Sequence, residues 1–149
     1  MKTIILLILS LTASAMDLTS TLKVEEGLRL SVYRCTKGYP TIGYGHRCEA
    51  NQKNITKDEA ESLLIADIAK AQKNVEKLVG KDAPQEVKNI VTAMVFQMGV
   101  DGVSKFKTML LCIKSKDYKG ASVAMLDSKW AKQTPKRAKR MSELMRNVK

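Results

Sequence analysis

Three residues in the segment 24–46 have side chains suited to acid–base chemistry. Cys35 follows Glu26 after nine residues, and Thr41 follows after a further six. Glu26 stands at the end of a predicted helix, just before Gly27, where the helix dipole disfavours an ionised carboxylate. Such a setting raises the pKa of a carboxyl group and keeps a proton available for donation, as a general acid requires. A glutamate at a helix end is more often a solvated surface residue, so the local pattern leaves both interpretations open.

The residues around this segment predict a small antiparallel sheet. Between residues 28 and 48, β-forming side chains are interrupted by glycines and Pro40, which is typical of a meander of two or three short strands. Apolar residues at helical spacing predict a short helix over 17–25. The polar stretch 49–54 is expected to be a loop.

Stronger helical patterns follow. Thr56 and Glu59 have the spacing of a capping box, and apolar residues at threes and fours then predict a helix of over twenty residues. The stretch 87–98 has the wide apolar stripe of a core helix, which Gly99 and Gly102 are expected to stop. Shorter helices are predicted at 108–114, 118–126 and 135–148.

These elements predict an α+β fold. We expect a sheet lobe at 28–55 and a connecting helix at 56–79. A helical lobe at 80–149 would also include the segment 16–26. No internal repeat or low-complexity tract divides the chain further.

The first fifteen residues predict an export signal. Lys2 supplies a positive start, residues 4–9 are an unbroken apolar run, and residues 13–15 form a small-residue cleavage site. The apolar run is too short to span a bilayer, and a buried N-terminal helix is the alternative. Removal of residues 1–15 leaves 134 residues with a net charge of +10. We therefore expect export to the host periplasm or secretion, where disulfides can form and where the chain meets a membrane only during export.

Charge and composition narrow the partners. The 149 residues include 26 basic and 15 acidic side chains, a net charge of +11, so an anionic partner is expected. One histidine argues against a histidine-rich metal centre, and three cysteines are too few for a disulfide-built scaffold. Neither a metal nor another cofactor is expected.

Four motifs in order resemble the phage-type lysozymes of glycoside hydrolase family 24, the T-even phage lysozyme group. In the first, Glu26 is followed by GLRL, a tyrosine, a turn, GY, TIG and GH. The others are ITKDEAE at 55–61, MVFQMG at 94–99 and SKW with QTPKRAKR at 128–140. The match covers nearly the whole chain after the signal and implies a lysozyme-like fold. It also implies hydrolysis of the β-1,4 bond between N-acetylmuramic acid and N-acetylglucosamine in peptidoglycan, with inversion.

The resemblance assigns roles to the three reactive residues. Glu26 matches the general acid that protonates the leaving glycosidic oxygen, and Thr41 matches the residue that positions the attacking water. The position between them is an aspartate in the family and activates that water. Here it is Cys35, a departure from the family pattern.

Cys35 leaves three interpretations open. A thiol with an ordinary pKa near 8.5 is mostly neutral at pH 7, although the flanking Arg34 and Lys37 could lower its pKa and supply a working thiolate. The cysteine could instead mark a weak binder, or a redox gate that a Cys35–Cys48 disulfide closes over a loop of about 14 residues. Cys112 lies in an apolar run and is expected to be an inert, buried thiol.

Five more residues match family positions. Arg137 matches the basic residue that pairs with the catalytic glutamate, although its basic neighbours also fit a solvated face. Phe96 and Gln97 match the lining of the saccharide cleft, within a stripe that is mostly core. His46 and Asp67 match a buried structural pair that does not take part in catalysis.

Competing functions remain open at this stage. The favoured one is a secreted, monomeric muramidase of phage origin that lyses a bacterial host by acting on peptidoglycan. The alternative is a cationic, non-enzymatic protein that binds peptidoglycan or disturbs membranes through its C-terminal helix, where apolar residues oppose a basic face. A nucleic-acid binder is disfavoured by the export signal and by the lack of a binding motif.

Overall fold

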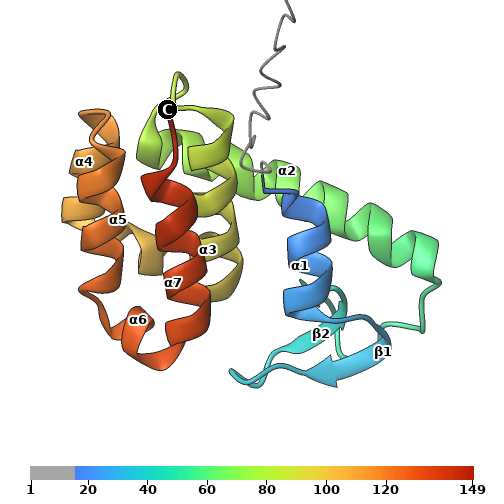
Figure 1. Ribbon diagram of the computed structural model, residues 1–149. Helices are drawn as coiled ribbons and strands as arrows, with labels where there is room; N and C mark the ends of the chain where they lie inside the picture. Colours follow the sequence, from blue (N-terminus) through green and yellow to red (C-terminus); the bar gives the residue numbers. More distant parts are fainter. Residues whose placement is uncertain (1–15) are drawn as a thin grey trace, which may run out of the picture.

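The computed structural model of the chain describes residues 16–149, so the predicted export signal at 1–15 lies outside the described part. The described chain forms two lobes that are joined by one long helix (Figure 1). One lobe carries a three-stranded sheet, and the other is a bundle of helices. The predicted α+β fold class, with a small sheet lobe joined by a long helix to a helical lobe, is therefore confirmed.

The first helix, α1 (Leu18–Glu26), leads directly into the sheet. Its N-cap is Asp17. The Asp17 carboxylate accepts a hydrogen bond from the backbone N–H of Ser20 and so satisfies one free donor of the first turn. Leu18 and Leu22 are buried on one face of α1. Val24 is 85% exposed, because it lies on the other face of the helix. The helix thus ends with Glu26 at the border between the core and the sheet.

Three short strands form the sheet of the small lobe. They are β1 (Arg29–Arg34), β2 (Pro40–Gly43) and β3 (His46–Arg47), which form an antiparallel meander in that order. After an irregularity near the start of β1, Tyr33 pairs with Thr41, and Thr41 in turn pairs with Arg47. Residues that pair across strands point to the same face, so these three side chains form one row across the sheet.

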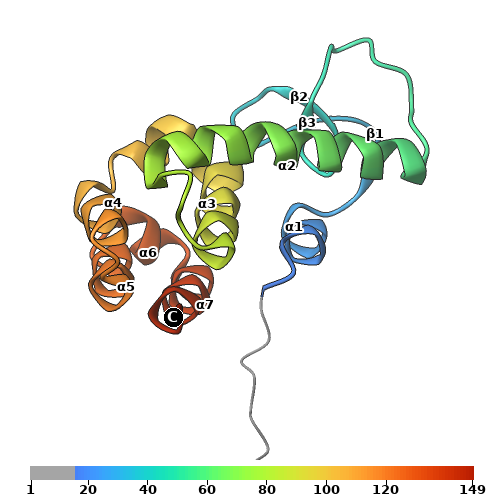
Figure 2. The same cartoon turned by 90° about the horizontal axis from the view of Figure 1, so that it is seen from above.

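The helix α2 (Lys57–Val79) is the spine between the lobes (Figure 2). It begins with the predicted capping box: the Glu59 N–H donates to Thr56 Oγ1 over 3.2 Å, and the Thr56 N–H donates to the Glu59 carboxylate over 2.6 Å. Gly80 caps its C-terminus at a positive φ of 95°. The predicted bounds of the connecting helix agree with the structure to within one residue.

The helix α3 (Gln85–Ser104) runs through the middle of the helical lobe (Figures 1 and 2). All of its residues from Ile90 to Val95 are buried. Gly99 has non-helical backbone angles, with φ 77° and ψ 167°, so the core helix ends there and a second helical segment leads on to Ser104 across a kink. The prediction that Gly99 stops the core helix is therefore confirmed, whereas Gly102 lies within the second segment and does not stop it.

Four shorter helices complete the helical lobe. They are α4 (Lys107–Lys114), α5 (Tyr118–Leu126), α6 (Lys129–Gln133) and α7 (Pro135–Arg146). Three of them were predicted, although α7 ends two residues before the expected 148. The five-residue α6 was not predicted, because its signal is only a Ser128 N-cap ahead of one short turn.

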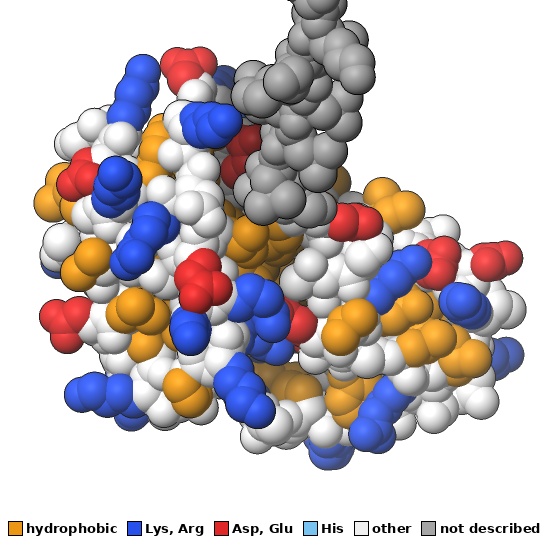
Figure 3. Space-filling view, viewed as in Figure 1, with side chains coloured by type: hydrophobic (Ala, Val, Ile, Leu, Met, Phe, Trp, Pro, Cys, Tyr) orange, Lys and Arg blue, Asp and Glu red, His pale blue; other side chains and the backbone are white. Residues whose placement is uncertain are grey.

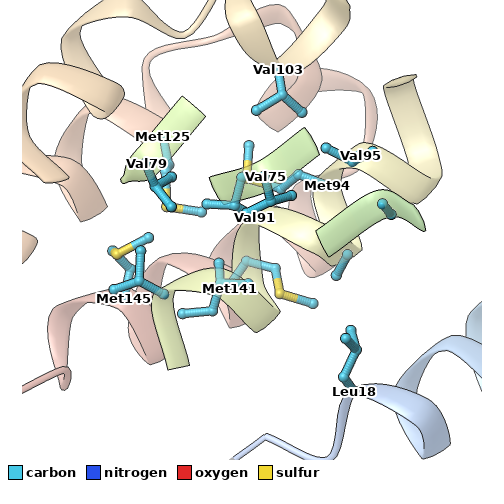
Figure 4. Packing of buried hydrophobic residues seen from close by; sticks show 14 of the residues in the cluster. Leu18, Val75, Val79, Val91, Met94, Val95, Val103, Met125, Met141 and Met145 are labelled. Carbon is cyan, nitrogen blue, oxygen red and sulfur yellow. The ribbon is translucent and has the colours of Figure 1, made fainter. Parts of the chain in front are cut away.

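Methionine and valine side chains make up much of the core of the helical lobe. Met94, Met125, Met141 and Met145 are each no more than 1% exposed and pack among valines of α2 and α3 (Figure 4). The apolar face of α7 is thus buried within the protein. This packing gives no support to the alternative function in which the same face disturbs membranes. Among the described helices, none has the length and apolar character needed to cross a bilayer.

Candidate active site

Glu26 is the last residue of α1 and lies half-buried beside the turn that joins β2 to β3. Gly45 in this turn has a φ of 82°, and a Cβ atom placed on it would lie 3.0 Å from Glu26 Oε2. The lack of a side chain at Gly45 therefore lets the backbone approach the carboxyl group. Burial raises the pKa of Glu26; the charge of Arg137 opposes this rise and the charge of Glu25 adds to it, with a net increase. The carboxyl group is thus kept closer to its protonated form.

One face of the sheet carries the other reactive side chains. Cys35 follows β1 and its N–H donates to the Tyr39 carbonyl over 3.0 Å, so the β1–β2 ladder extends by one more pair. Because side chains alternate along a strand, Cys35 and Tyr39 lie on the same face as the row Tyr33, Thr41 and Arg47. The sheet therefore brings the predicted residues Cys35 and Thr41 together.

The Cys35 thiol is held in a polar setting. Partial burial raises its pKa, but the backbone N–H groups of Lys37 and Tyr39, the Thr41 hydroxyl and the charge of Arg47 together lower it. Thr41 is only 2% exposed, and its hydroxyl donates to the Tyr39 carbonyl over 2.9 Å. This surrounding favours a thiolate more than an unperturbed cysteine would experience.

Tyr33 is influenced by the charges of both Glu26 and Cys35. Burial raises the pKa of its phenol, and the charges of both Glu26 and Cys35 raise it further, whereas Arg29 lowers it. The Arg29 guanidinium lies 4.8 Å from the centre of the Tyr33 ring. Tyr33 therefore lies within electrostatic range of both the Glu26 carboxyl and the Cys35 thiol.

Arg137 makes its ion pair with Glu25 and not with Glu26. Arg137 Nε lies 3.4 Å from Glu25 Oε1, and Arg140 also binds this oxygen. The Glu25 side chain is 7% exposed. The predicted pairing of Arg137 with Glu26 is thus replaced by a longer-range effect, in which the Arg137 charge lowers the pKa of Glu26. Figure 3 shows basic and acidic side chains gathered along the hollow between the two lobes.

A pocket of about 640 Å³ lies between the β1–β2 turn and the helical lobe. It is lined by Lys37, Gln97, Phe106 and Trp130 among others, but not by the three reactive residues of the site. Gln97 Oε1 accepts a hydrogen bond of 2.8 Å from Trp130 Nε1, which fixes the Gln97 amide at the pocket wall. Phe96 is not part of this wall; its side chain packs against the core. Of the two expected cleft residues, Gln97 thus lines the pocket and Phe96 does not.

The described cysteines are free thiols, and the sheet opposes a Cys35–Cys48 disulfide. Cys48 follows β3, and its N–H donates to the Pro40 carbonyl over 3.1 Å. Cys35 and Cys48 therefore lie on opposite sides of β2, roughly 9–10 Å apart, whereas a disulfide needs Cα atoms within about 7 Å. They also point to opposite faces, because Cys48 is adjacent to Arg47 in the strand. The disulfide gate considered from the sequence would require this sheet to open.

Two further predicted sites are structural in their placement. His46 Nδ1 lies 2.8 Å from Asp67 Oδ2, which ties β3 to α2. Cys112 packs against the core as expected, but it is half-buried and not fully buried as predicted. Within residues 16–149, no group of three or more histidine, cysteine or acidic side chains is arranged to hold a metal ion.

The phage lysozyme family matches residues 23–147, which is most of the chain. The chain belongs to the phage lysozyme family. It is 33% identical to Probable T4-type lysozyme 1 of Dictyostelium discoideum, over 80% of this chain and 88% of that protein. It is also 33% identical to an endolysin of Acyrthosiphon pisum secondary endosymbiont phage 1, over 74% of this chain and 75% of that protein.

A third relative is a larger protein. The Pre-baseplate central spike protein Gp5 of Enterobacteria phage T4 is 33% identical over 87% of this chain, but the match spans only 28% of Gp5. The family resemblance noted from the motifs is therefore confirmed, and this phage lysozyme is a glycoside hydrolase that acts on peptidoglycan.

Motif matching within this lysozyme family missed three residues beside the reactive groups: Glu25, Tyr39 and Arg47. Glu25 is hidden by its neighbour, because the motif draws attention to the second of two adjacent glutamates. Arg47 could have been found by counting across the Gly43–Gly45 turn, since a symmetric hairpin places it opposite Thr41. The contact of Arg47 with Tyr39 depends on side-chain conformation and had no sequence signal.

Proposed function

We propose that this lysozyme cleaves the β-1,4 bond between N-acetylmuramic acid and N-acetylglucosamine, with Glu26 as general acid and Cys35 as the base that activates water. The observation that carries the proposal is the half-buried Glu26 carboxyl, whose pKa is raised, beside the β2–β3 turn of the sheet that carries Cys35 and Thr41 on one face. General acid catalysis needs a group that still holds its proton when substrate binds. The environment of Glu26 supports that role.

The reaction balances with these two groups. The Glu26 carboxyl gives its proton to the glycosidic oxygen as the bond from that oxygen to the anomeric carbon breaks. A water oxygen bonds to the anomeric carbon from the opposite face, and the Cys35 thiolate accepts the proton that this water loses. Inversion follows from attack on the opposite face. The resulting Glu26 carboxylate and Cys35 thiol then return to their starting forms by exchange of one proton through solvent.

The directions of the two pKa shifts support this assignment. The reactive form needs Glu26 protonated and Cys35 ionised at the same time, yet the ordinary pKa values, about 4.3 for a glutamate and about 8.5 for a cysteine, oppose it. The pKa of Glu26 is raised and that of Cys35 is lowered, so the structure narrows the gap from both sides. Each unit by which the gap between the two pKa values narrows increases the fraction of enzyme with Glu26 protonated and Cys35 ionised about tenfold.

Thr41 completes the proposed machinery. Its buried hydroxyl is held by the Tyr39 carbonyl, on the same face as Cys35 and one strand away from it. We assign it the positioning of the attacking water next to the thiolate. Gln97 and Arg137 are proposed to contact the glycan, and Phe96 to support the wall of the cleft.

The setting of the reaction is also part of the proposal. We propose that residues 1–15 direct the chain to the host periplasm or the exterior, where it reaches peptidoglycan as a monomer and lyses the cell. The net charge of +11 supports this setting, since bacterial cell-wall polymers are anionic.

Digestion of purified peptidoglycan by matched glutamate variants tests the proposal. Glu26→Gln should lower the rate by at least about 100-fold, because the amide has no proton to give. Glu143→Gln, which alters an exposed carboxyl on α7, should retain activity. Mass spectrometry of the products should show N-acetylmuramic acid at the new reducing ends. Retained activity in Glu26→Gln, or N-acetylglucosamine at those ends, would contradict the assignment.

A further inference from the structure

Arg47 is held in place by an aromatic ring of the neighbouring strand. Its guanidinium carbon lies 3.9 Å from the centre of the Tyr39 ring. Arg47 pairs directly with Thr41, so Tyr39 is its diagonal neighbour on β2, within reach of a long side chain. A stacked arginine keeps its charge at a defined position even though the residue is exposed.

Tyr39 connects this charge to Cys35. The Tyr39 carbonyl accepts the Cys35 N–H over 3.0 Å, and the Gly38 N–H donates to the Cys35 carbonyl over 2.7 Å. The same Tyr39 carbonyl accepts the Thr41 hydroxyl. The backbone of Tyr39 therefore positions the thiol and the hydroxyl, and its ring positions Arg47 on the same face of the sheet.

The basic neighbours of Cys35 in the sequence do not supply its positive charge. The Arg34 guanidinium is engaged with the Gly38 carbonyl over 2.8 Å, and Lys37 acts on the thiol through its backbone N–H. The other ionisable groups of the site are Tyr33, which is neutral below its raised pKa, and Glu26. Arg47 is thus the side-chain cation that lowers the pKa of Cys35.

We propose that Arg47, stacked on Tyr39, is a positioning residue that keeps Cys35 anionic beside Thr41. This inference rests on the proposed role of Cys35 as the base. The family uses an aspartate at this position, which is ionised at neutral pH without assistance, whereas a thiol is ionised there only where hydrogen bonds and nearby cations lower its pKa. Arg47 compensates for the cysteine by supplying such a cation from the third strand.

The ionisation of Cys35 can be measured without any substrate. In a Cys48→Ser, Cys112→Ser background, alkylation of Cys35 by iodoacetamide reports its thiolate fraction across a pH series. Arg47→Met should slow alkylation at pH 7 by roughly two- to fivefold, the size of one screened charge–charge interaction. The difference should vanish near pH 10, where the thiol ionises in either protein. Equal rates throughout, or faster alkylation of the variant at every pH, would overturn the proposal.

Arg29→Met is the matched control for alkylation. Arg29 is also an arginine stacked on a tyrosine of the sheet, but its charge does not act on Cys35. Its alkylation profile should equal that of the background protein. If Arg29→Met slows alkylation as much as Arg47→Met, loss of a stacked arginine disturbs the sheet in general and the proposal is wrong.

A double-mutant cycle with peptidoglycan as the substrate separates positioning from substrate binding. Arg47→Met should lower the hydrolysis rate several-fold in the natural enzyme and have little effect in the Cys35→Asp background, because an aspartate stays ionised without Arg47. Equal losses in both backgrounds would mean that Arg47 contacts the glycan, and the proposal would be wrong. If Cys35→Ser retains full activity, the proposed role of Cys35 fails instead, whatever the alkylation experiment shows.

Discussion

The Arg137 side chain is paired with Glu25, the residue that precedes the proposed general acid, through an Nε to Oε1 distance of 3.4 Å. Arg140 binds the same carboxylate oxygen, so one glutamate of α1 is held by two arginines of α7. This contact ties the start of the sheet lobe to the helical lobe. It also leaves Glu26 without a direct cationic partner. Such a partner would favour the ionised form of the Glu26 carboxyl. The adjacent residues Glu25 and Glu26 thus differ in environment: Glu25 is paired with two arginines, and Glu26 has no direct cationic partner.

Glu25→Gln should destabilise the fold by about 1–3 kcal/mol, because it leaves two arginines without their buried partner. Chemical denaturation at pH 7 measures this loss. Glu49→Gln, at an exposed position outside this contact, should remain within about 0.5 kcal/mol of the natural protein. A Glu25→Gln protein that is as stable as the natural one would show that the arginine pairs do not hold the lobes together.

Cys35→Asp should change the shape of the pH–rate profile. In the natural enzyme the carboxyl titrates below the thiol, so the reactive form is a minor species whose fraction is constant between the two pKa values. An aspartate titrates below the raised pKa of Glu26. Between these two pKa values, the form with Glu26 protonated and the aspartate ionised becomes the major species. The rate at its optimum should therefore rise by at least about tenfold, and the alkaline limb should move down to the pKa of Glu26.

The measurement is hydrolysis of peptidoglycan from pH 4 to pH 10 at fixed ionic strength. Cys35→Ser is the control, because a hydroxyl stays neutral over this range and should leave only a small residual rate. An alkaline limb that stays in place in Cys35→Asp would mean that the thiol does not set it, contrary to the proposed role of Cys35.

Alanine variants of two glycines that have the same φ distinguish the effect of backbone strain from the effect of contact with Glu26. Gly38 and Gly45 both have a φ of 82°, so an alanine at either position costs about 1–2 kcal/mol of backbone strain. A Cβ on Gly45 would lie 3.0 Å from Glu26 Oε2, whereas a Cβ on Gly38 has no atom within 4 Å. Both alanine variants should lose similar stability, but Gly45→Ala should lose roughly tenfold or more in rate as the carboxyl is displaced. Equal rates would show that the carboxyl tolerates displacement.

Local sequence signals were sufficient for the elements with strong periodicity or caps. The capping box at Thr56 and Glu59 correctly placed the start of α2, and the β-forming residues interrupted by glycines and Pro40 correctly predicted a meander of short strands. These features depend on residues close in sequence, where backbone geometry alone decides the outcome.

The features that were missed depend on long-range packing. Whether Arg137 pairs with Glu25 or Glu26 depends on how the last turn of α1 faces α7, which are separated by more than one hundred residues. The second helical segment of α3, which passes through Gly102 to Ser104, depends on the core around it, since glycine disfavours a helix locally and Val103 is buried there. Neither outcome follows from local propensity.

The difference in the free energy of unfolding between Glu26→Gln and the natural protein should depend on pH in a defined direction. Because the folded pKa of Glu26 is raised, chiefly by burial, its contribution to stability is fully present below the unfolded value of 4.5 and is lost as the pH rises through the folded value. The glutamine has no charge to bury, so the variant should gain stability relative to the natural protein between pH 4 and pH 7. Thermal unfolding at both pH values measures this difference, with Glu143→Gln as a control that should show none. A relative gain at pH 4 instead would mean that the folded pKa of Glu26 is lowered, and Glu26 would then be unsuited to donate a proton.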